Sequence, residues 1–217
     1  MPHTLRQTLV WSVVLFGLAA GGCLTARNEK VVAGYPISEP ADHCHASATF
    51  VYVVNGLDPV HLAGVPALTK RLQASGYPNT QFAEWKEIGR IEKEIRKTHG
   101  CQPDAQFALI GYSIGAPVVR NAATRLIRDG VPVALVAYIG GDYLSDSAET
   151  RVPGAGRVVN ITGDGHLMTG RNLFFNGTDI TGATNVRLAG TRHFFLPEHP
   201  ETFATLFAAL NAATGGF

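Results

Sequence analysis

The sequence predicts an α/β domain built on a doubly wound, mostly parallel sheet of about six strands with flanking helices. From Ser47 onward, short and continuously apolar runs alternate with segments that have helical periodicity. Runs that are apolar on both faces are typical of parallel strands covered by helices on each side. With 217 residues, 46% of them hydrophobic and 16% charged, the chain is long enough to bury one large core. We therefore expect one globular domain over residues 47–217.

The strands of this sheet are predicted from apolar runs of strand length. Five runs are rich in Val, Ile, Leu and aromatic residues, and a sixth is weaker. The five clear runs are 49–54, 107–110, 133–139, 158–162 and 186–188, and the weaker one is 79–82.

Four helices are predicted from apolar residues that recur on one helical face. The expected buried positions are Leu62, Val65, Leu68 and Leu72 in the first helix, Trp85, Ile88, Ile91 and Ile95 in the second, Val118, Ala122 and Leu126 in the third, and Phe203, Leu206, Phe207 and Leu210 in the fourth. Ligands of such sheets bind at the carboxyl ends of the strands, so functional side chains are sought there.

The strongest functional signal is the segment 111–115, Gly-Tyr-Ser-Ile-Gly, directly after the strand 107–110 and directly before a helix. A serine on such a tight turn is raised above the sheet edge in a strained backbone conformation, and glycines flank it because a Cβ would clash. The following helix directs its N-terminal amides at the same place, where they can stabilise negative charge on a substrate oxygen. We therefore predict that Ser113 is a catalytic nucleophile.

A serine hydroxyl is a poor nucleophile at neutral pH unless a neighbouring base takes its proton, and histidine is the usual base. His193 follows the last predicted strand, 186–188, and precedes the terminal helix, so a loop can bring its ring over Ser113. His61 and His166 fall on the same edge of the sheet but belong to other elements. His193 is accordingly the predicted general base.

The imidazole needs a carboxylate that fixes its tautomer and stabilises its protonated form. Asp164 follows the strand 158–162, which is the strand next to the one that leads to His193. Asp142 follows the strand 133–139 and offers a competing arrangement. Both satisfy the chain order Ser, Asp, His, and each could instead shape a turn beside its glycine neighbours. We favour Asp164 and keep Asp142 as the alternative acid.

Two backbone amides are needed to bind the oxyanion of an acyl-transfer reaction. One should come from Ile114, directly after the nucleophile, and the second from the loop after the first strand, where Gly56 permits close approach. The amide of Leu57 or Gly56 is the predicted second donor. Asp58, followed by Pro59, is expected to shape this turn rather than take part in the chemistry.

These features together resemble the α/β-hydrolase superfamily. Asn55-Gly56 matches its oxyanion position, segment 111–115 its nucleophile elbow and His193 its histidine loop, and the resemblance covers residues 47–212. The run Gly-Tyr-Ser-Ile-Gly-Ala is also similar to the elbow of cutinases. The superfamily usually begins with two further strands that this sequence lacks, which implies a reduced version of the fold.

The resemblance and the triad imply a serine hydrolase that cleaves carboxylic esters or thioesters through an acyl-enzyme on Ser113. The interval between the strands 133–139 and 158–162 is too short for a helical cap, so an open site is expected. Apolar residues in 167–175 could line an acyl pocket or simply cover the sheet edge. Two other interpretations stay open: a non-catalytic binding or envelope protein with this fold, and an acyltransferase.

The first 22 residues do not look like part of the domain. A short polar start with Arg6 leads into the apolar run 9–20, which is too short to span a bilayer comfortably and ends just before Cys23. This segment resembles a bacterial lipoprotein signal, so we expect a signal peptide over 1–22, a lipid on Cys23 and a tether over 23–46 in an exported, membrane-anchored protein. Ordinary secretion or a periplasmic location is the alternative.

Partners and cofactors are constrained mainly by what the sequence lacks. The formal net charge is +1 and there is no Lys/Arg block, which argues against nucleic acid as a ligand. No metal-ligand spacing or phosphate loop is present, so we expect neither metal nor cofactor. The expected partners are a small-molecule or lipid ester and the membrane, with a monomeric protein.

A lipid on Cys23 would leave Cys44 and Cys101 as a pair in an oxidising compartment. Each cysteine precedes one of two strands that are neighbours in the α/β-hydrolase fold, so both should lie at the amino-terminal edge of the sheet. A structural Cys44–Cys101 disulfide is therefore expected.

Overall fold

The computed structural model describes residues 48–141, 150–165 and 179–215. The chain divides into two compact units, Met1–Ser38 and Glu39–Phe217, and all described residues belong to the second. The expected signal peptide 1–22, the tether 23–46, Cys23 and Cys44 lie outside the described residues. Within the part that is described, no helix is both long enough and apolar enough to cross a bilayer.

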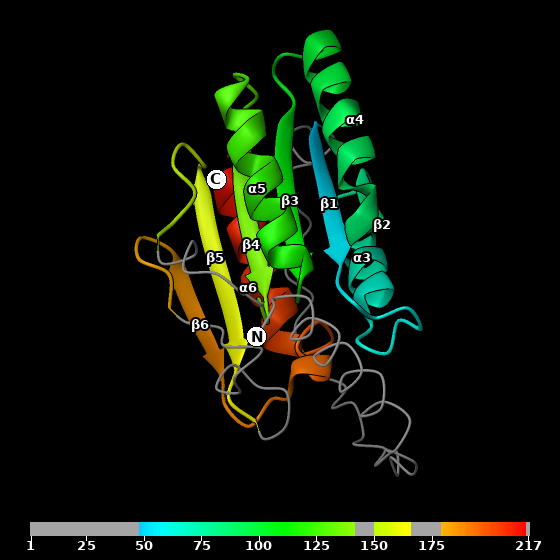
Figure 1. The fold of residues 1–217 in the computed structure, drawn as a ribbon, viewed down its shortest axis with the longest axis vertical. Coiled ribbons are helices and arrows are strands. Elements are labelled where there is room, and N and C mark those ends of the chain that lie inside the picture. Colours follow the sequence, from blue (N-terminus) through cyan, green and yellow to red (C-terminus); the bar gives the residue numbers. More distant parts are fainter. Residues whose placement is uncertain (1–47, 142–149, 166–178, 216–217) are drawn as a thin grey trace, which may run out of the picture. The chain divides into compact units, whose positions relative to one another are not determined.

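A parallel six-stranded sheet forms the centre of the described domain (Figure 1). Every neighbouring pair in the order β2-β1-β3-β4-β5-β6 is parallel. The strands are β1 (Thr49–Asn55), β2 (Thr80–Glu84), β3 (Gln106–Tyr112), β4 (Val133–Ile139), β5 (Arg157–Gly163) and β6 (Thr184–Leu188). The predicted fold class is confirmed, and the weakest predicted strand is β2 at one edge.

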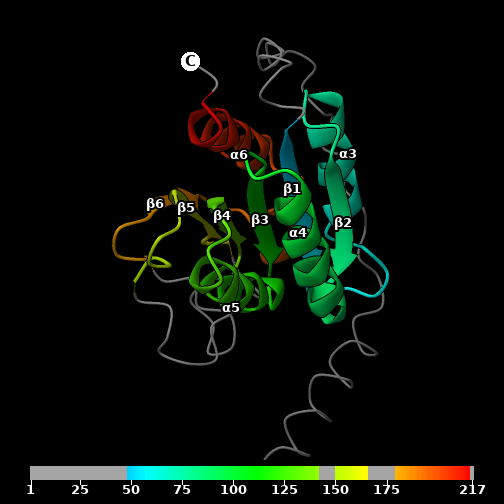
Figure 2. The same cartoon turned by 90° about the horizontal axis from the view of Figure 1, so that it is seen from above.

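Helices cover both faces of this sheet (Figure 2). The helices α3 (Val65–Ala74) and α6 (Pro200–Ala213) pack on one face, and α4 (Ile88–Cys101) and α5 (Gly115–Arg128) pack on the other. Two short 3-10 helices, η1 (Trp85–Glu87) and η3 (His193–Phe195), precede α4 and α6. Helices on both faces explain why the strands read as continuous apolar runs, since neither side of a central strand meets water.

Alternate residues of each strand point into two separate apolar cores. In β1, Val51 and Val53 contact the core beneath α3 and α6, while Tyr52 and Val54 contact the core beneath α4 and α5. All four side chains are fully buried. The sheet is thus fixed on both faces, which gives a rigid base for the loops at its carboxyl edge.

The expected faces of the first and third helices were partly wrong. Leu62 is exposed in a loop, because α3 begins only at Val65 after Gly64, whose φ of 71° breaks the helical path. In α5 the buried residue is Val119 rather than Val118, since the helix starts at Gly115 and turns position 119 toward the sheet. Both errors displace a residue without changing the order of elements.

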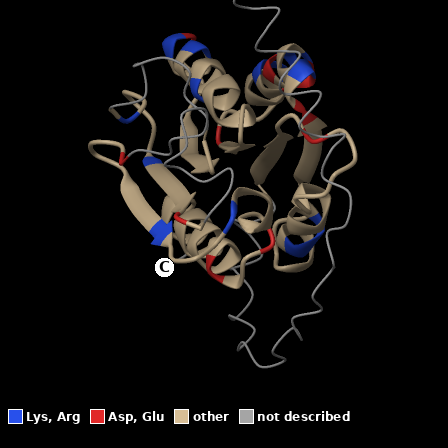
Figure 3. Ribbon diagram, turned by 60° about the horizontal axis from the view of Figure 1, so that its bottom comes forward, with Lys and Arg blue, Asp and Glu red and all other residues tan. Residues whose placement is uncertain are grey.

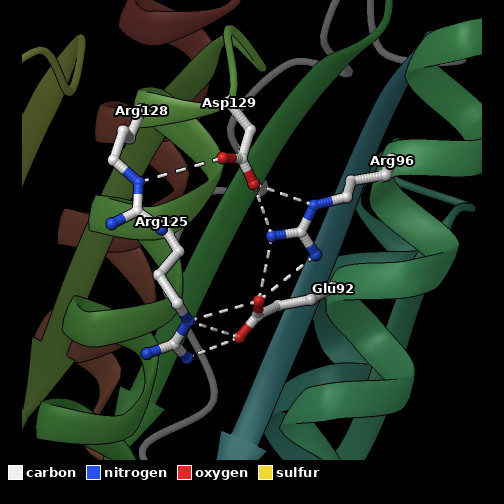
Figure 4. A network of polar contacts seen from close by, with 5 residues as sticks. All are labelled: Glu92, Arg96, Arg125, Arg128 and Asp129. Atoms are coloured by element: carbon white, nitrogen blue, oxygen red, sulfur yellow. Dashed lines mark hydrogen bonds and ion pairs between the residues drawn. The ribbon is translucent and has the colours of Figure 1, made fainter.

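A network of ion pairs joins α4 to α5 on the outer surface (Figure 4). The mostly buried carboxylate of Glu92 accepts hydrogen bonds from Arg125 and Arg96, and Arg96 also donates to Asp129 at 2.7 Å. Arg128 lies 3.9 Å from Asp129 and is largely exposed. This network ties together the two helices that cover one face of the sheet.

The expected Cys44–Cys101 disulfide is absent from the structure. Cys101 is a free, exposed thiol. It is the last residue of α4 rather than part of the connection that leads into β3. Its side chain therefore lies on the helix surface, and the structural role predicted for it is corrected.

Candidate active site

Ser113 occupies the turn between β3 and α5 with a backbone φ of 53°. Only one other non-glycine residue in the described chain, His61, has a positive φ. Such a conformation is costly for a residue with a Cβ and is found mostly where function requires it. The Ser113 amide donates to the carbonyl oxygen of Ile139 at 3.0 Å, so the last residue of β4 holds the turn in place.

The flanking glycines are required by close backbone approach. A Cβ on Gly111 would collide with the backbone of Gly115, and a Cβ on Gly115 would lie 2.5 Å from the carbonyl oxygen of Val54. The strand, the turn and the start of α5 can pack this tightly only without those side chains. The predicted strand-turn-helix context of Ser113 is confirmed.

The loop after β1 lies directly beside the serine. A Cβ on Gly56 would be 2.7 Å from Ser113 Cβ and 3.3 Å from the amide nitrogen of Ile114. The structure therefore brings Gly56 close to Ser113 and Ile114, and the predicted use of these amides as an oxyanion site stays a prediction. Ile114 is the residue just before α5, so its amide lies at the N-terminal end of that helix.

His193 lies at the same edge, in η3 after β6, and is buried. Its ring stacks on that of Tyr112, with centroids 4.9 Å apart, and the Tyr112 hydroxyl donates to the His193 carbonyl oxygen at 3.4 Å. This contact holds the predicted base against the residue that directly precedes the predicted nucleophile. Among the residues described, the Ser113 hydroxyl makes no hydrogen bond, so its pairing with His193 stays a prediction.

One edge of the imidazole lies against the end of β4. A Cβ on Gly140 would lie 2.8 Å from Nδ1 of His193 and 3.0 Å from Cε1. Gly140 has a φ of 55°, so both its conformation and the adjacent ring demand glycine. The end of β4 thus holds the backbone of Ser113 through Ile139 and contacts the ring of His193 through Gly140.

Burial lowers the pKa of His193 to about 4, and the negative charge of Asp58 partly opposes that shift. The imidazole is therefore neutral at physiological pH and able to accept a proton. The neutral form is the one that a general base needs.

Asp58 has a second property that the sequence did not indicate. Its carboxylate accepts from the amides of Leu62 and Ala63 at 2.9 and 2.8 Å, which confirms the predicted turn-shaping role. Asp58 is also buried, and its charge acts on both His193 and Tyr112. No local pattern could reveal this, because the three residues come together only through the sheet.

Asp164, the favoured acid, has its described hydrogen bond to the loop after β6 rather than to the His193 ring. Its Oδ1 accepts from the amide of Gly190 at 2.6 Å, and its side chain is exposed. The predicted adjacency of β5 and β6 is confirmed. The loops after these strands also meet, since the Gly165 amide donates to the Thr191 carbonyl oxygen at 3.1 Å. The Asp164 carboxylate therefore joins these two loops, which is the structural role expected as the alternative to catalysis for an aspartate beside glycine.

Several other predicted positions lie outside the described residues. They are the alternative acid Asp142 and the apolar segment 167–175. Gly140 and Gly141, which lead to Asp142, are described and buried.

The loop after β1 contains the second strained residue, His61, with a φ of 56°. Its Nε2 lies 2.8 Å from Oε1 of Glu84, the last residue of β2. The Asn55 side chain donates to the Asp58 carbonyl oxygen at 3.1 Å in the same loop. The loop beside Ser113 is therefore held by side chains from two strands. Across the three described ranges, no cluster of three His, Cys, Asp or Glu residues could hold a metal ion.

Comparisons with known proteins identify the architecture. No family model and no curated protein sequence matches the chain. Among solved structures, the product of gene lin2722 of Listeria innocua is similar with a TM-score of 0.55 and 11% identity, over 75% of this chain and 93% of that one. The mature lipase BlEst2 of Bacillus licheniformis is similar with a TM-score of 0.53 and 13% identity, over 83% of this chain and 96% of that one.

A third similar structure is the NocB thioesterase domain from the nocardicin cluster, in covalent complex with a fluorophosphonate nocardicin G analog. Its TM-score is 0.50 at 16% identity, covering 80% of this chain and 98% of that one. Identities this low establish shape rather than activity. Taken with the six parallel strands, the helices on both faces and the strained serine after β3, they show that this chain has the α/β-hydrolase fold.

Proposed function

We propose that the protein is a serine hydrolase that cleaves carboxylic esters or thioesters. The observation that carries the proposal is the conformation of Ser113, a serine with a φ of 53° on a turn that three other segments hold in place. Strain at a buried, nucleophilic side chain is stored where chemistry uses it.

In the proposed reaction, Ser113 Oγ attacks the substrate carbonyl carbon while Nε2 of His193 accepts the hydroxyl proton. The amides of Ile114 and of Gly56 or Leu57 stabilise the oxyanion. The imidazolium then protonates the leaving alcohol or thiol, which leaves an acyl-enzyme. Water then attacks the acyl carbon and gives a proton to His193. The acid is released when His193 returns this proton to Ser113 Oγ.

For this sequence of steps the imidazole and the hydroxyl must approach one another. Hydrogen bonds between catalytic groups are often long without substrate and tighten in the complex. The ring of His193 already contacts Tyr112, the residue before the nucleophile, so the required movement is a local one.

For the acid, we propose Asp142 in preference to Asp164. The Nδ1 edge of His193 lies against Gly140, and the sequence continues from there through Gly141 to Asp142. Asp164 is occupied by the amide of Gly190 and is exposed. The Asp142→Asn variant should lose activity roughly 10³-fold or more. Asp164→Asn is the matched control and should lose less than tenfold; the reverse ranking would assign the role to Asp164.

The proposed activity is tested with p-nitrophenyl esters of increasing acyl length. Ser113→Ala and His193→Ala should each lower kcat by roughly 10⁴- to 10⁶-fold. Thermal unfolding of both variants shows whether they are folded. A loss of less than tenfold in a folded Ser113→Ala protein would contradict the assignment.

We also propose that the protein is exported and carries a lipid on Cys23, because the apolar run 9–20 ends just before that cysteine. Cells fed a radiolabelled fatty acid should incorporate label into the chain, and Cys23→Ser should abolish incorporation. Label that persists in Cys23→Ser would reject the attachment site.

A further inference from the structure

The structure also indicates how the proposed active site meets its substrate. We propose that the rim of this site, formed by Leu57, Val60, Leu62 and Phe195, docks on a lipid surface, so that the substrates are lipid esters in an aggregate or membrane. This inference rests on the proposed hydrolase function and names its substrate class.

The rim holds all the large exposed apolar side chains of the described chain. Their exposed fractions are 52% for Leu57, 69% for Val60, 68% for Leu62 and 56% for Phe195. Single exposed apolar residues are common, but four on the two segments that carry the site are not scattered. Exposure at this level leaves apolar area that a lipid phase would remove from water.

The two rim segments lie side by side next to the proposed nucleophile. Leu57 follows Gly56, which packs against Ser113, and Phe195 belongs to the 3-10 helix that begins with His193. A Cβ on Gly64, at the end of the first segment, would collide with the side chain of Glu198, just after the second. An acyl chain entering from a lipid phase at this rim would therefore meet the loop that packs against Ser113.

The rim segments are held firmly enough to present these side chains. Asp58 accepts the amides of Leu62 and Ala63, and His61 pairs with Glu84, so these polar groups of the first segment are bonded within the protein. The apolar side chains of this segment, those of Val60 and Leu62, are exposed to solvent. The four apolar side chains of the rim thus form a surface that does not pack against the rest of the described domain, as expected for a docking surface.

A lipid surface fits the surroundings better than a charged partner does. Figure 3 brings this edge of the sheet forward, and the Lys and Arg colours gather mainly on the helices around it. The exposed charged side chains beside Phe195 are one of each sign, Arg192 and Glu198. The chain before residue 48 adds a second argument, because a lipid on Cys23 and a tether over 23–46 would keep the domain at a membrane. Extended, that tether reaches roughly 80 Å, which lets the rim turn toward the bilayer.

The opposite end of the sheet supplies a matched control site. Cys101 is exposed and precedes β3 at its amino end, whereas the rim lies beyond its carboxyl end. A strand of seven residues separates the two positions by roughly 20 Å or more. A probe on Cys101 therefore stays in water when the rim docks.

The test attaches a polarity-sensitive fluorophore to one cysteine of the full chain and adds phosphatidylcholine vesicles. The background carries Ser113→Ala, so that lipids are not hydrolysed, together with Cys23→Ser and Cys44→Ser. One protein adds Leu62→Cys and Cys101→Ser, and the control keeps Cys101. We expect a blue shift at position 62 and none at position 101. Adding Val60→Ser and Phe195→Ser should weaken the docking that position 62 reports roughly tenfold.

Other results overturn the inference. Equal shifts at both positions, or none at position 62, would mean that the rim does not face the lipid. A blue-shifted probe at position 62 before vesicles are added would place the chain's own run 9–20, or a second copy, on the rim. Dilution separates these two, since only the second depends on protein concentration. Because Ser113→Ala is used, these outcomes do not depend on hydrolysis, whereas failure of the ester assay would reject the function and leave lipid docking standing.

Discussion

The buried imidazole of His193 predicts a specific pH dependence of stability. Burial lowers its pKa from 6.5 to about 4 in the folded protein, while in the unfolded chain the pKa should return to the ordinary value. Because the unfolded chain binds the proton more readily, this contribution to stability is fully present above pH 6.5. It decreases as the pH falls through the interval from 6.5 to 4, and below about 4 it is lost.

The size of this contribution follows from the shift. Each unit of pKa difference corresponds to about 1.4 kcal/mol, so the free energy of unfolding should fall by roughly 3 kcal/mol across the interval because of His193 alone. His193→Gln removes the titrating group. The difference in unfolding free energy between wild type and His193→Gln isolates this term, since other groups titrate in both proteins.

Urea unfolding of the two proteins at pH 7, 6, 5 and 4 measures that difference. We expect the stability advantage of the wild type to shrink by about 1.4 kcal/mol per pH unit below pH 6.5. The kcat/KM of the wild type should correspondingly stay high until the pH approaches 4. A difference that is constant from pH 7 to 4, with an activity loss centred near pH 6.5, would show that the ring is solvated and the reasoning wrong.

Three further predictions concern the site and its support. Gly140→Ala should lower kcat/KM at least tenfold because the new Cβ would lie 2.8 Å from His193 Nδ1. The control Gly130→Ala is also at positive φ but has open space around it, so it should cost only about 1 kcal/mol of stability and leave activity intact. Glu92→Gln should lower the free energy of unfolding, measured by calorimetry, by about 1 to 2 kcal/mol, since it leaves two partly exposed arginines without their shared carboxylate. Arg128→Ala, at the exposed end of the network, should change it by less than about 0.5 kcal/mol. Equal effects of the two substitutions would contradict the importance of the network. Cys101 should react with a thiol reagent in the native, non-reduced protein. Complete protection of this thiol would instead support the originally predicted Cys44–Cys101 disulfide.

Local patterns predicted most of the fold and the tight turn that holds Ser113. The inner strands were predictable because helices cover both faces of the sheet and leave strands such as β1 and β3 mostly apolar. The turn at Ser113 was predictable because it needs glycine on both sides, and the segment 111–115 has a glycine at each end. These features depend on neighbours in the chain.

The differences from the sequence predictions have both local and long-range causes. Leu62 continues the apolar spacing of α3, but the positive φ of Gly64 makes the helix begin only at Val65. Asp164 lies on the expected loop, yet its carboxylate binds Gly190 rather than His193, and which partner it takes depends on loop conformation. The charge of Asp58 near His193 likewise arises only in the folded sheet.

The central claim is that His193 activates Ser113, and covalent labelling tests it most directly. A fluorophosphonate should add one phosphonyl group per chain of the wild type, and peptide mass spectrometry should place it on Ser113. Ser113→Ala should take up none, and His193→Ala should react far more slowly. A folded wild-type protein that remains unlabelled, or one labelled at another residue, would contradict the account.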